Sequence, residues 1–363
     1  MGSILVYVLL SPTFGMHQYT ADLAHQALTL GHEVHVVTTS RLPRDRYMAQ
    51  VQIHTPVAHC STGFTGEGAR PFELGRLWQC IKGLRPDRVH FTGVHLWNPL
   101  LLARLRQAGC ATIHTLHDLD PHTAAPHGRL IRLWNRFVIA AAHQLLVHAE
   151  RYQQRLLRNG RSADCVHAWP LSHTFLGAGA AAQLCTAAPN RTWEPWVLFF
   201  GRLEAYKGIN VLLAAASSLA ACPSGPFPSI VLAGRGALPG LSLPGVIHLD
   251  RHVDDALGCD LFRRCRALVL PYTGATQSAL PATAYAFGKP VIVADSGALA
   301  EVVIPGKTGW VVPPNDAPAL AAAIDAVRAA APSTLADIGE AGRQQFDKLR
   351  QVQAEKLATL YAG

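Results

Sequence analysis

The stretch Gly201-Arg202-Leu203-Glu204-Ala205-Tyr206-Lys207-Gly208 lies between two apolar segments. Residues 196–200 (Trp-Val-Leu-Phe-Phe) predict a buried strand before it, and residues 209–215 predict the start of a helix after it. Two cations five residues apart therefore stand on a loop at the carboxyl end of a strand, where ligands bind in an open α/β sheet. Two cations beside a helix amino terminus suit a diphosphate. The simpler alternative is a solvated basic loop.

Short apolar runs alternate with segments of helical periodicity along the whole chain. Strands that are separated by helices pair in parallel and form a doubly wound α/β sheet. The runs that predict strands lie at residues 4–10, 33–38, 88–91, 112–116 and 144–148 in the first half, and at 196–200, 229–233, 246–249, 267–271, 290–294 and 310–312 in the second.

Residues 177–195 are rich in Ala, Gly, Pro, Asn and Thr, which is typical of a connection between domains. A chain of 363 residues is also too long for one ordinary core. We therefore predict two facing doubly wound domains, residues 1–176 and 177–363, with an interdomain cleft between their strand ends. Such clefts are common sites of small-molecule chemistry. The last helix has the position in the chain to pack back on the first domain.

The composition argues against several classes of protein. The chain is 49% hydrophobic and 15% charged, with a mean hydropathy of +0.15. No apolar run approaches the ~18 residues that a membrane-spanning helix needs. The first residues, Met-Gly-Ser-Ile-Leu-Val, lack a basic segment and a cleavage site, so we interpret them as a first strand and not as a signal peptide. Eight cysteines without C-x-x-C pairing or zinc spacing indicate reduced thiols in a cytoplasmic protein.

Positive charge is concentrated in the first half. Residues 1–175 contain 17 Lys and Arg against 10 Asp and Glu, a net charge of +7, and the remainder contains 15 against 14, a net charge of +1. An anionic membrane surface, an acidic acceptor or nucleic acid would each explain this excess. Nucleic acid explains it least well, because no signature of a nucleic-acid-binding fold is present. The basic and aromatic segment 129–139 predicts either a helix on a membrane interface or a core helix with a basic outer face.

Three segments of the second half, with a shorter one near the start, carry a resemblance to a known family. They are residues 200–208, residues 286–292, residues 297–303 with 306–314, and Leu-Gly-His-Glu-Val at 30–34. The chain resembles the retaining family 4 glycosyltransferases of the GT-B type, which consist of two Rossmann-like domains. The resemblance implies transfer of a sugar from a nucleoside-diphosphate sugar to an acceptor hydroxyl, with retention of the anomeric configuration. It also implies a role in cell-surface glycan or glycolipid synthesis.

In such enzymes an Arg and a Lys hold the donor diphosphate, and Arg202 and Lys207, beside Gly201, match them. The leaving group is an anion, so cations aimed at its developing charge stabilise the transition state. Such folds need no metal because these cations replace one, and no cofactor is expected besides the nucleotide sugar. Gly15 and Arg235 are expected to approach the donor phosphate. The alternatives are an ordinary strand-to-helix turn at Gly15 and a solvated side chain at Arg235.

The family's second signature, two glutamates eight positions apart, is missing from this sequence. Alignment through Gly-Lys-Pro at 288–290 puts Ala275 and Thr283 at those positions. The loop between them follows a predicted strand, so its backbone N–H groups can cradle phosphate and its amide side chain can bind a sugar hydroxyl. The alternative is a plain helix cap without a ligand. The predicted donor contacts of this loop are Thr276, Gln277, Ser278 and Thr283.

Residues 114–122 (His-Thr-Leu-His-Asp-Leu-Asp-Pro-His) follow another predicted strand. Similar enzymes carry a histidine there that faces the donor hexose, and His117 matches it; the alternative is a histidine satisfied within the core. Asp118 and Asp120 fit the D-x-D pattern of metal-dependent glycosyltransferases, but this architecture does not resemble theirs. We therefore predict no metal site, and acceptor contacts for Asp118, Asp120 and His122. An inverting enzyme would instead use one of the aspartates as a general base.

Two further classes of function remain open at this point. A non-catalytic binding or scaffold subunit would keep the fold without the acidic pair. An inverting glycosyltransferase or a nucleotide-sugar epimerase would use the same fold for other chemistry, and the fold does not decide between them. The predicted partners are a nucleotide sugar, a glycan or lipid-linked acceptor and an anionic membrane surface. The expected location is the cytoplasm or the inner face of the membrane.

Overall fold

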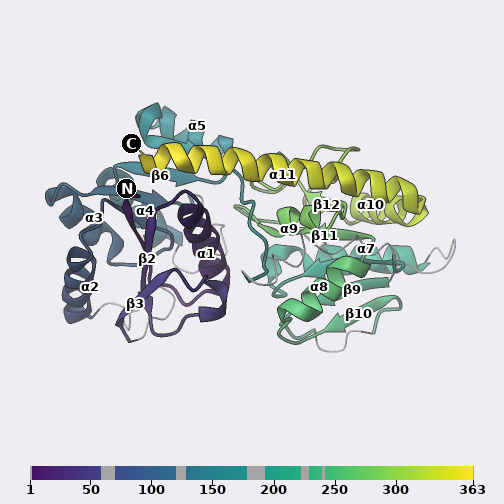
Figure 1. Cartoon of the computed structure of the whole chain (residues 1–363). Coiled ribbons are helices and arrows are strands. Elements are labelled where there is room, and N and C mark those ends of the chain that lie inside the picture. Colours follow the sequence, from purple (N-terminus) through teal and green to yellow (C-terminus); the bar gives the residue numbers. More distant parts are fainter. Residues whose placement is uncertain are drawn as a thin grey trace. The chain divides into compact units, whose positions relative to one another are not determined.

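The computed structural model describes residues 2–58, 70–119, 128–177, 193–221, 229–238 and 242–362 (Figure 1). The chain divides into two compact units, Met1–Ala178 with Arg350–Gly363, and Gly179–Leu349. Each unit contains one parallel sheet with helices between its strands, so the predicted class of two doubly wound α/β domains is confirmed. Among the described helices, none combines the length and apolarity that crossing a bilayer requires.

The first unit is built on a seven-stranded parallel sheet with the order β3-β2-β1-β4-β5-β6-β7. Its strands are β1 (Ile4–Leu9), β2 (Glu33–Thr39), β3 (Gln52–Val57), β4 (Arg88–Phe91), β5 (Ala111–Thr115), β6 (Gln144–Val147) and β7 (Val166–Ala168). The helices between them are α1 (Phe14–Thr29), α2 (Pro71–Gly83), α3 (Asn98–Gln107), α4 (Gly128–Ala141) and α5 (Glu150–Arg158), with short 3₁₀ turns η1 (Arg44–Arg46) and η3 (Ala163–Cys165).

The second unit is built on a six-stranded parallel sheet with the order β10-β9-β8-β11-β12-β13. Its strands are β8 (Trp196–Phe200), β9 (Ser229–Ala233), β10 (Val246–Leu249), β11 (Ala267–Leu270), β12 (Val291–Ala294) and β13 (Gly309–Val312). The helices are α7 (Ile209–Ala221), α8 (Asp255–Arg264), α9 (Leu280–Ala286), α10 (Ala317–Ala329) and the part of α11 (Pro332–Ala362) up to Leu349, with 3₁₀ turns η4 (Ala205–Lys207) and η5 (Ala300–Val302).

Both sheets reverse their winding direction once. In the first unit the chain passes from β1 to β2 and β3 on one side, and β4 then pairs with the other side of β1. In the second unit β9 and β10 lie on one side of β8, and β11 pairs with the other side. In an open α/β sheet the ligand crevice lies outside the carboxyl ends of the strands at this switch point. The loops after β1, β4, β8 and β11 are therefore the places to look for chemistry.

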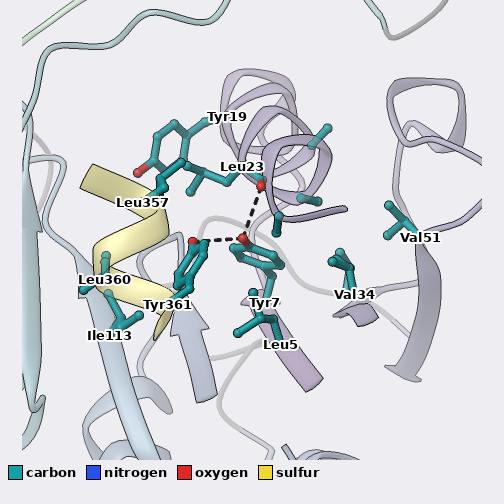
Figure 2. Close-up of a cluster of buried hydrophobic side chains, with 14 of the residues drawn as sticks. Leu5, Tyr7, Tyr19, Leu23, Val34, Val51, Ile113, Leu357, Leu360 and Tyr361 are labelled. Atoms are coloured by element: carbon teal, nitrogen blue, oxygen red, sulfur yellow. Dashed lines mark hydrogen bonds between the residues drawn. The ribbon is translucent and has the colours of Figure 1, made fainter. Parts of the chain in front are cut away.

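The carboxyl-terminal end of helix α11 is part of the first unit's core (Figure 2). The hydroxyls of Tyr361 and Tyr7 are hydrogen-bonded at 2.9 Å, and His90 Nδ1 lies 3.0 Å from the Tyr361 hydroxyl. Leu357 and Leu360 are buried in the same cluster. These contacts join the end of the chain to its first strand, so residues 350–363 are needed to complete the first unit.

Several histidines are buried in the first unit, and burial lowers their pKa values because it disfavours the charged form. The pKa of His114 is lowered to about 3, and those of His17 and His173 to about 4. The pKa values of His90 and His148 are lowered well below 6.5, chiefly by desolvation and further by neighbouring histidines. These side chains are therefore neutral at physiological pH.

We expect the free energy of unfolding to decrease as the pH is lowered from about 6.5 towards 4. Histidines in the unfolded chain titrate near pH 6.5, so between these values the unfolded state binds more protons than the folded state. Urea unfolding at pH 7.5 and pH 5.0 measures the difference.

Replacing His173 by Asn should reduce this pH dependence, because one buried histidine is removed. Replacing the exposed His252 by Asn is the matched control and should leave it unchanged. Equal unfolding free energies for the wild-type protein at the two pH values would contradict the account of these histidines.

Candidate functional site

At one position of the loop after β8, the backbone conformation and the close packing admit only glycine. Gly208 ends the turn η4 in the left-handed region, with φ of +71°. A Cβ at Gly208 would overlap the carbonyl oxygen of Pro271, which follows β11. The glycine therefore lets the loop after β8 lie directly against the loop after β11, at the switch point of the sheet.

Backbone hydrogen bonds join this loop to its neighbours on both sides. The N–H of Leu203 donates to the carbonyl of Arg235 at 2.8 Å, which connects it to the loop after β9. The N–H of Thr273 donates to the carbonyl of Tyr206 at 2.8 Å, which connects it to the loop after β11. Residue Arg235 itself is exposed. Three strand-end loops thus form one connected layer at the carboxyl edge of the sheet.

Lys207 is a partly buried cation in this layer. Its Nζ lies 5.9 Å from the ring centroids of both Tyr206 and Tyr272, and it covers Gly201, where an added Cβ would lie 3.0 Å from the ammonium nitrogen. Burial lowers the pKa of Lys207 to about 8, while Glu204 raises it less strongly. Within the described part of the chain, no carboxylate forms a salt bridge with this ammonium group. An anion bound beside it would favour its charged form.

Arg202 is the more exposed cation of the pair. Its Nη1 lies 2.8 Å from Glu204 Oε1, and its side chain is 68% exposed. An ion pair at this exposure is worth little, on the order of 0.2–1 kcal/mol. The guanidinium can therefore exchange this carboxylate for a phosphate at small cost, because both offer it bidentate hydrogen bonds.

The loop after β11 is held by the turn that follows β12. The N–H of Ala275 donates to Ser296 Oγ at 3.0 Å, and the N–H of Ala298 donates to the carbonyl of Thr276 at 3.0 Å. Gly297, with φ of +58°, lies so close that a Cβ would overlap the carbonyl oxygen of Ala275. The turn after β12 thus fixes the backbone that precedes α9, although this stretch of backbone carries no acidic side chain.

The predicted donor contacts of this loop differ in accessibility. Thr276 is buried, and Gln277 and Ser278 are half-buried. Ser278 Oγ accepts a hydrogen bond from the N–H of Leu280 at 3.2 Å, while the N-cap residue of α9 is Ala279, without a side-chain cap. Thr283 is fully buried, and its hydroxyl donates to the carbonyl of Ala279 at 3.3 Å. The donor roles of these four residues stay predictions.

In the first unit, His117 follows β5 and lies beside the switch point. Its Nε2 donates to the carbonyl of Thr92, the residue after β4, at 2.9 Å. Its ring packs edge-on against Tyr19, with centroids 5.0 Å apart, and its pKa is lowered, chiefly by burial. His117 is thus a neutral, oriented imidazole at this sheet edge, and its contact with a sugar stays a prediction.

The other residues predicted in the first unit have different surroundings. Gly15 is exposed in the first turn of α1, and a Cβ there would meet nothing within 4 Å, so the space beside it is open. Asp118 is half-buried, and its backbone carbonyl accepts a hydrogen bond from Asn135 Nδ2 at 2.9 Å. Asp120 and His122 lie outside the described residues. The described residues contain no cluster of three His, Cys, Asp or Glu side chains placed to hold a metal ion.

Sequence reasoning missed the residues that surround the two cations. Tyr206 and Tyr272 flank Lys207, and Glu204 holds Arg202. Tyr272 follows β11 by two residues, so its place at the carboxyl edge was predictable, but its contact with Lys207 depends on the pairing of β8 with β11. In the sequence, Glu204 is an ordinary loop carboxylate. Its ion pair with Arg202 is seen only in the structure.

Replacing Gly208 by Ala should destabilise the second unit by several kcal/mol, because a left-handed conformation costs a non-glycine residue about 1–3 kcal/mol and the added methyl group also overlaps Pro271. Gly306→Ala is the matched control: its φ of +74° is similar, but the space around its Cβ is open. Urea unfolding compares the two variants. Equal losses of unfolding free energy would mean that the close approach to Pro271 is not a structural constraint.

Two family models match this chain in succession. Residues 14–172 match the model described as "Glycosyl transferase 4-like domain", and residues 194–329 match the model described as "Glycosyl transferases group 1". The first match covers most of the first unit and the second covers most of the second unit. Both models describe glycosyltransferases.

Curated relatives and a solved structure are similar over most of the chain. D-inositol 3-phosphate glycosyltransferase 2 of Catenulispora acidiphila is 28% identical over 90% of this chain and 84% of its own length. GDP-mannose:glycolipid 4-beta-D-mannosyltransferase of Xanthomonas campestris pv. campestris is 24% identical over 66% of this chain and 67% of its own length. Sucrose-phosphate synthase from Thermosynechococcus elongatus superimposes with a TM-score of 0.75 over 99% of this chain and 98% of that one, at 21% identity, which shows a shared fold. The chain is therefore a glycosyltransferase of the GT-B type, with a glycosyl transferase 4-like domain followed by a glycosyl transferases group 1 domain.

Proposed function

We propose that this glycosyltransferase moves a sugar from a nucleoside-diphosphate sugar to a hydroxyl of a glycan or lipid-linked acceptor, with retention of the anomeric configuration. The observation that carries the proposal is the position of Lys207 and Arg202. Both stand on the loop between β8 and α7, beside the switch point where β11 joins β8. An anionic ligand at this edge would meet two cations and the connected layer of strand-end loops.

The two cations have distinct tasks in this proposal. With a pKa of about 8, most Lys207 side chains are charged at pH 7 and have no salt bridge to a carboxylate among the described residues. Lys207 binds the diphosphate from a partly desolvated position, where the attraction is stronger than in water. Arg202 turns from Glu204 to the phosphate oxygens. Both interactions strengthen as the sugar–phosphate bond breaks and negative charge develops on the leaving group.

The loop of residues 276–278 completes the donor site in this proposal. Its backbone is fixed by Ser296 and Gly297, so the amide of Gln277 and the hydroxyl of Ser278 are held at the same sheet edge as Lys207. They would replace the paired glutamates that similar enzymes carry. In the first unit, His117 and Gly15 would face the reacting sugar, and Asp118, with Asp120 and His122, would bind the acceptor.

The names of relatives support the acceptor class. One relative is named for D-inositol 3-phosphate and another for GDP-mannose and a glycolipid. We propose an acceptor of this kind, a polar hydroxyl compound that carries phosphate or a lipid. The enzyme would then work in the cytoplasm or on the inner face of the membrane, where nucleotide sugars and lipid-linked acceptors meet.

Retention is proposed from the resemblance of the second-half segments to retaining enzymes. The alternative is inversion, with Asp118 or Asp120 as general base. Proton NMR of the glycoside product distinguishes an α-linked from a β-linked sugar, because a glycosidic bond keeps its anomeric configuration. Inversion relative to the donor would contradict the proposed stereochemistry while leaving the donor site unaffected.

Replacing Lys207 or Arg202 by Ala should each reduce turnover by more than roughly tenfold, because one charge-assisted phosphate contact contributes about 1.5–3 kcal/mol. Steady-state kinetics with the nucleotide sugar found by a thermal-shift screen of UDP-, GDP- and dTDP-sugars measures the change. Lys307→Ala removes an exposed cation that precedes β13, outside the strand-end loops, and measures the effect of charge alone. A folded Lys207→Ala, Arg202→Ala double variant with near-normal kinetics would overturn the diphosphate assignment.

Sugar transfer should proceed without a divalent metal, because the two cations supply the positive charge that the leaving diphosphate needs. Activity measured in EDTA should match activity in buffer with added manganese. Loss of activity in EDTA with recovery in manganese would instead support the D-x-D interpretation of Asp118 and Asp120.

A further inference from the structure

We infer that helices α3 and α4 of the first unit form a docking face for an anionic lipid bilayer. The inference deepens the proposed function by naming the surface that would bring the enzyme to a membrane-bound acceptor. The inference rests on the proposed function only in that the function explains why the enzyme would need a membrane. The surface itself is argued from exposure, charge and shape, and its test needs neither donor nor acceptor.

Helix α4 exposes large apolar side chains in one stripe. Leu130, Leu133 and Phe137 are 42%, 49% and 58% exposed. Their spacing of three and four residues puts them on the same side of the helix. Leu100 on the neighbouring helix α3 is also exposed, at 48%. Exposed apolar side chains are ordinary when single, but four on two packed helices indicate an interaction surface.

The opposite side of α4 is firmly attached to the domain. Val138 is fully buried, and Trp134 Nε1 donates to the carbonyl of His95 at 2.9 Å. Asn135 Nδ2 donates to the carbonyl of Asp118 at 2.9 Å. The outer side of α4 exposes arginines, as the sequence predicts for a basic outer face, and it exposes apolar side chains as well. Because the helix is held in place, its exposed stripe is a fixed feature of the surface.

The charge of this face suits an anionic surface. Helices α3 and α4 together contain five arginines and no acidic residue: Arg104, Arg106, Arg129, Arg132 and Arg136. Within the described part of the chain, no carboxylate forms a salt bridge with any of the five. Arg129, Arg132 and Arg136 each directly precede one residue of the apolar stripe. The three arginines therefore form a second stripe beside it on the helix. Apolar side chains bordered by cations are the pattern of a helix that lies in a lipid headgroup layer.

A groove between the two helices gives the face its shape. It has a volume of about 530 Å³ and is lined by Leu100, Ala103, Arg106 and Phe137, among others. The guanidinium of Arg106 donates to the carbonyl of Ala140 at 3.3 Å, which joins α3 to α4 across this groove. Leu133 and Phe137 would enter the acyl region, and the arginine stripe would contact lipid phosphates.

Co-sedimentation with vesicles of phosphatidylglycerol and of phosphatidylcholine at low salt tests the inference. The wild-type protein should bind the anionic vesicles and largely ignore the zwitterionic ones, and added salt should weaken the binding by screening. The triple variant Arg129→Gln, Arg132→Gln, Arg136→Gln should lose roughly tenfold or more in affinity. The variant Leu133→Ser, Phe137→Ser should also bind more weakly, because its apolar contact is removed.

Matched controls separate this face from general charge and hydrophobicity. The triple variant Arg251→Gln, Lys307→Gln, Lys348→Gln removes the same charge from exposed positions of the second unit. The variant Ile247→Ser, Ile304→Ser removes exposed apolar side chains there. Both should bind vesicles as the wild-type protein does. Lys207→Ala should bind them equally, so a failed donor assignment would not affect this measurement.

Three outcomes would overturn the inference. The first is a wild-type protein that does not bind anionic vesicles. The second is equal binding by the α4 variants and the wild-type protein. The third is a dimer, detected by light scattering, that dissociates when Leu133 and Phe137 are replaced, while the same variant still binds vesicles. A second copy of the chain would then be the occupant of this face.

Discussion

The close approach of Gly208 to the carbonyl of Pro271 fixes the geometry of the candidate donor site. It lets the loops after β8 and β11 touch at the switch point of the second sheet, which a side chain at residue 208 would prevent. Lys207 precedes this glycine, and its ammonium group lies to one side of a pair of tyrosine rings, 5.9 Å from the centroid of each. Lys207 is therefore a partly buried cation with a pKa near 8, and no carboxylate in the described chain forms a salt bridge with it. This cation is the chemical basis of the proposed function.

Much of the fold was predictable because several central strands are buried on two faces and appear as apolar runs. The predicted strands at residues 196–200 and 229–233 coincide with β8 and β9. The prediction missed β3 and β7, which are the two edge strands of the first sheet. Edge strands are partly exposed, β3 contains Pro56, and β7 has three residues, so neither shows the run that marks a central strand.

The candidate site was predictable where a residue's position follows from the chain order. Arg202 and Lys207 come after a strand, so their place at the carboxyl edge follows from the α/β pattern alone. The environment of Lys207 does not follow from it, because Tyr272 reaches the lysine only through the pairing of β8 with β11. The burial of Thr283 and the bond from His117 to Thr92 likewise depend on tertiary packing, which the sequence does not specify locally.

The most direct test of the account is calorimetric titration of UDP, GDP and dTDP into the wild-type protein and the Lys207→Ala variant from pH 6.5 to 9.5. The nucleotide also titrates at the two ends of this range, through its terminal phosphate at low pH and its base at high pH, so the comparison with Lys207→Ala isolates the contribution of the lysine. We predict that the affinity of the tightest nucleotide is constant near neutral pH and decreases above about 8, as Lys207 loses its proton. The Lys207→Ala variant should bind it weakly and without this decrease. Equal affinities of the two proteins, or a wild-type affinity that does not change with pH, would contradict the assignment of Lys207 to the donor diphosphate.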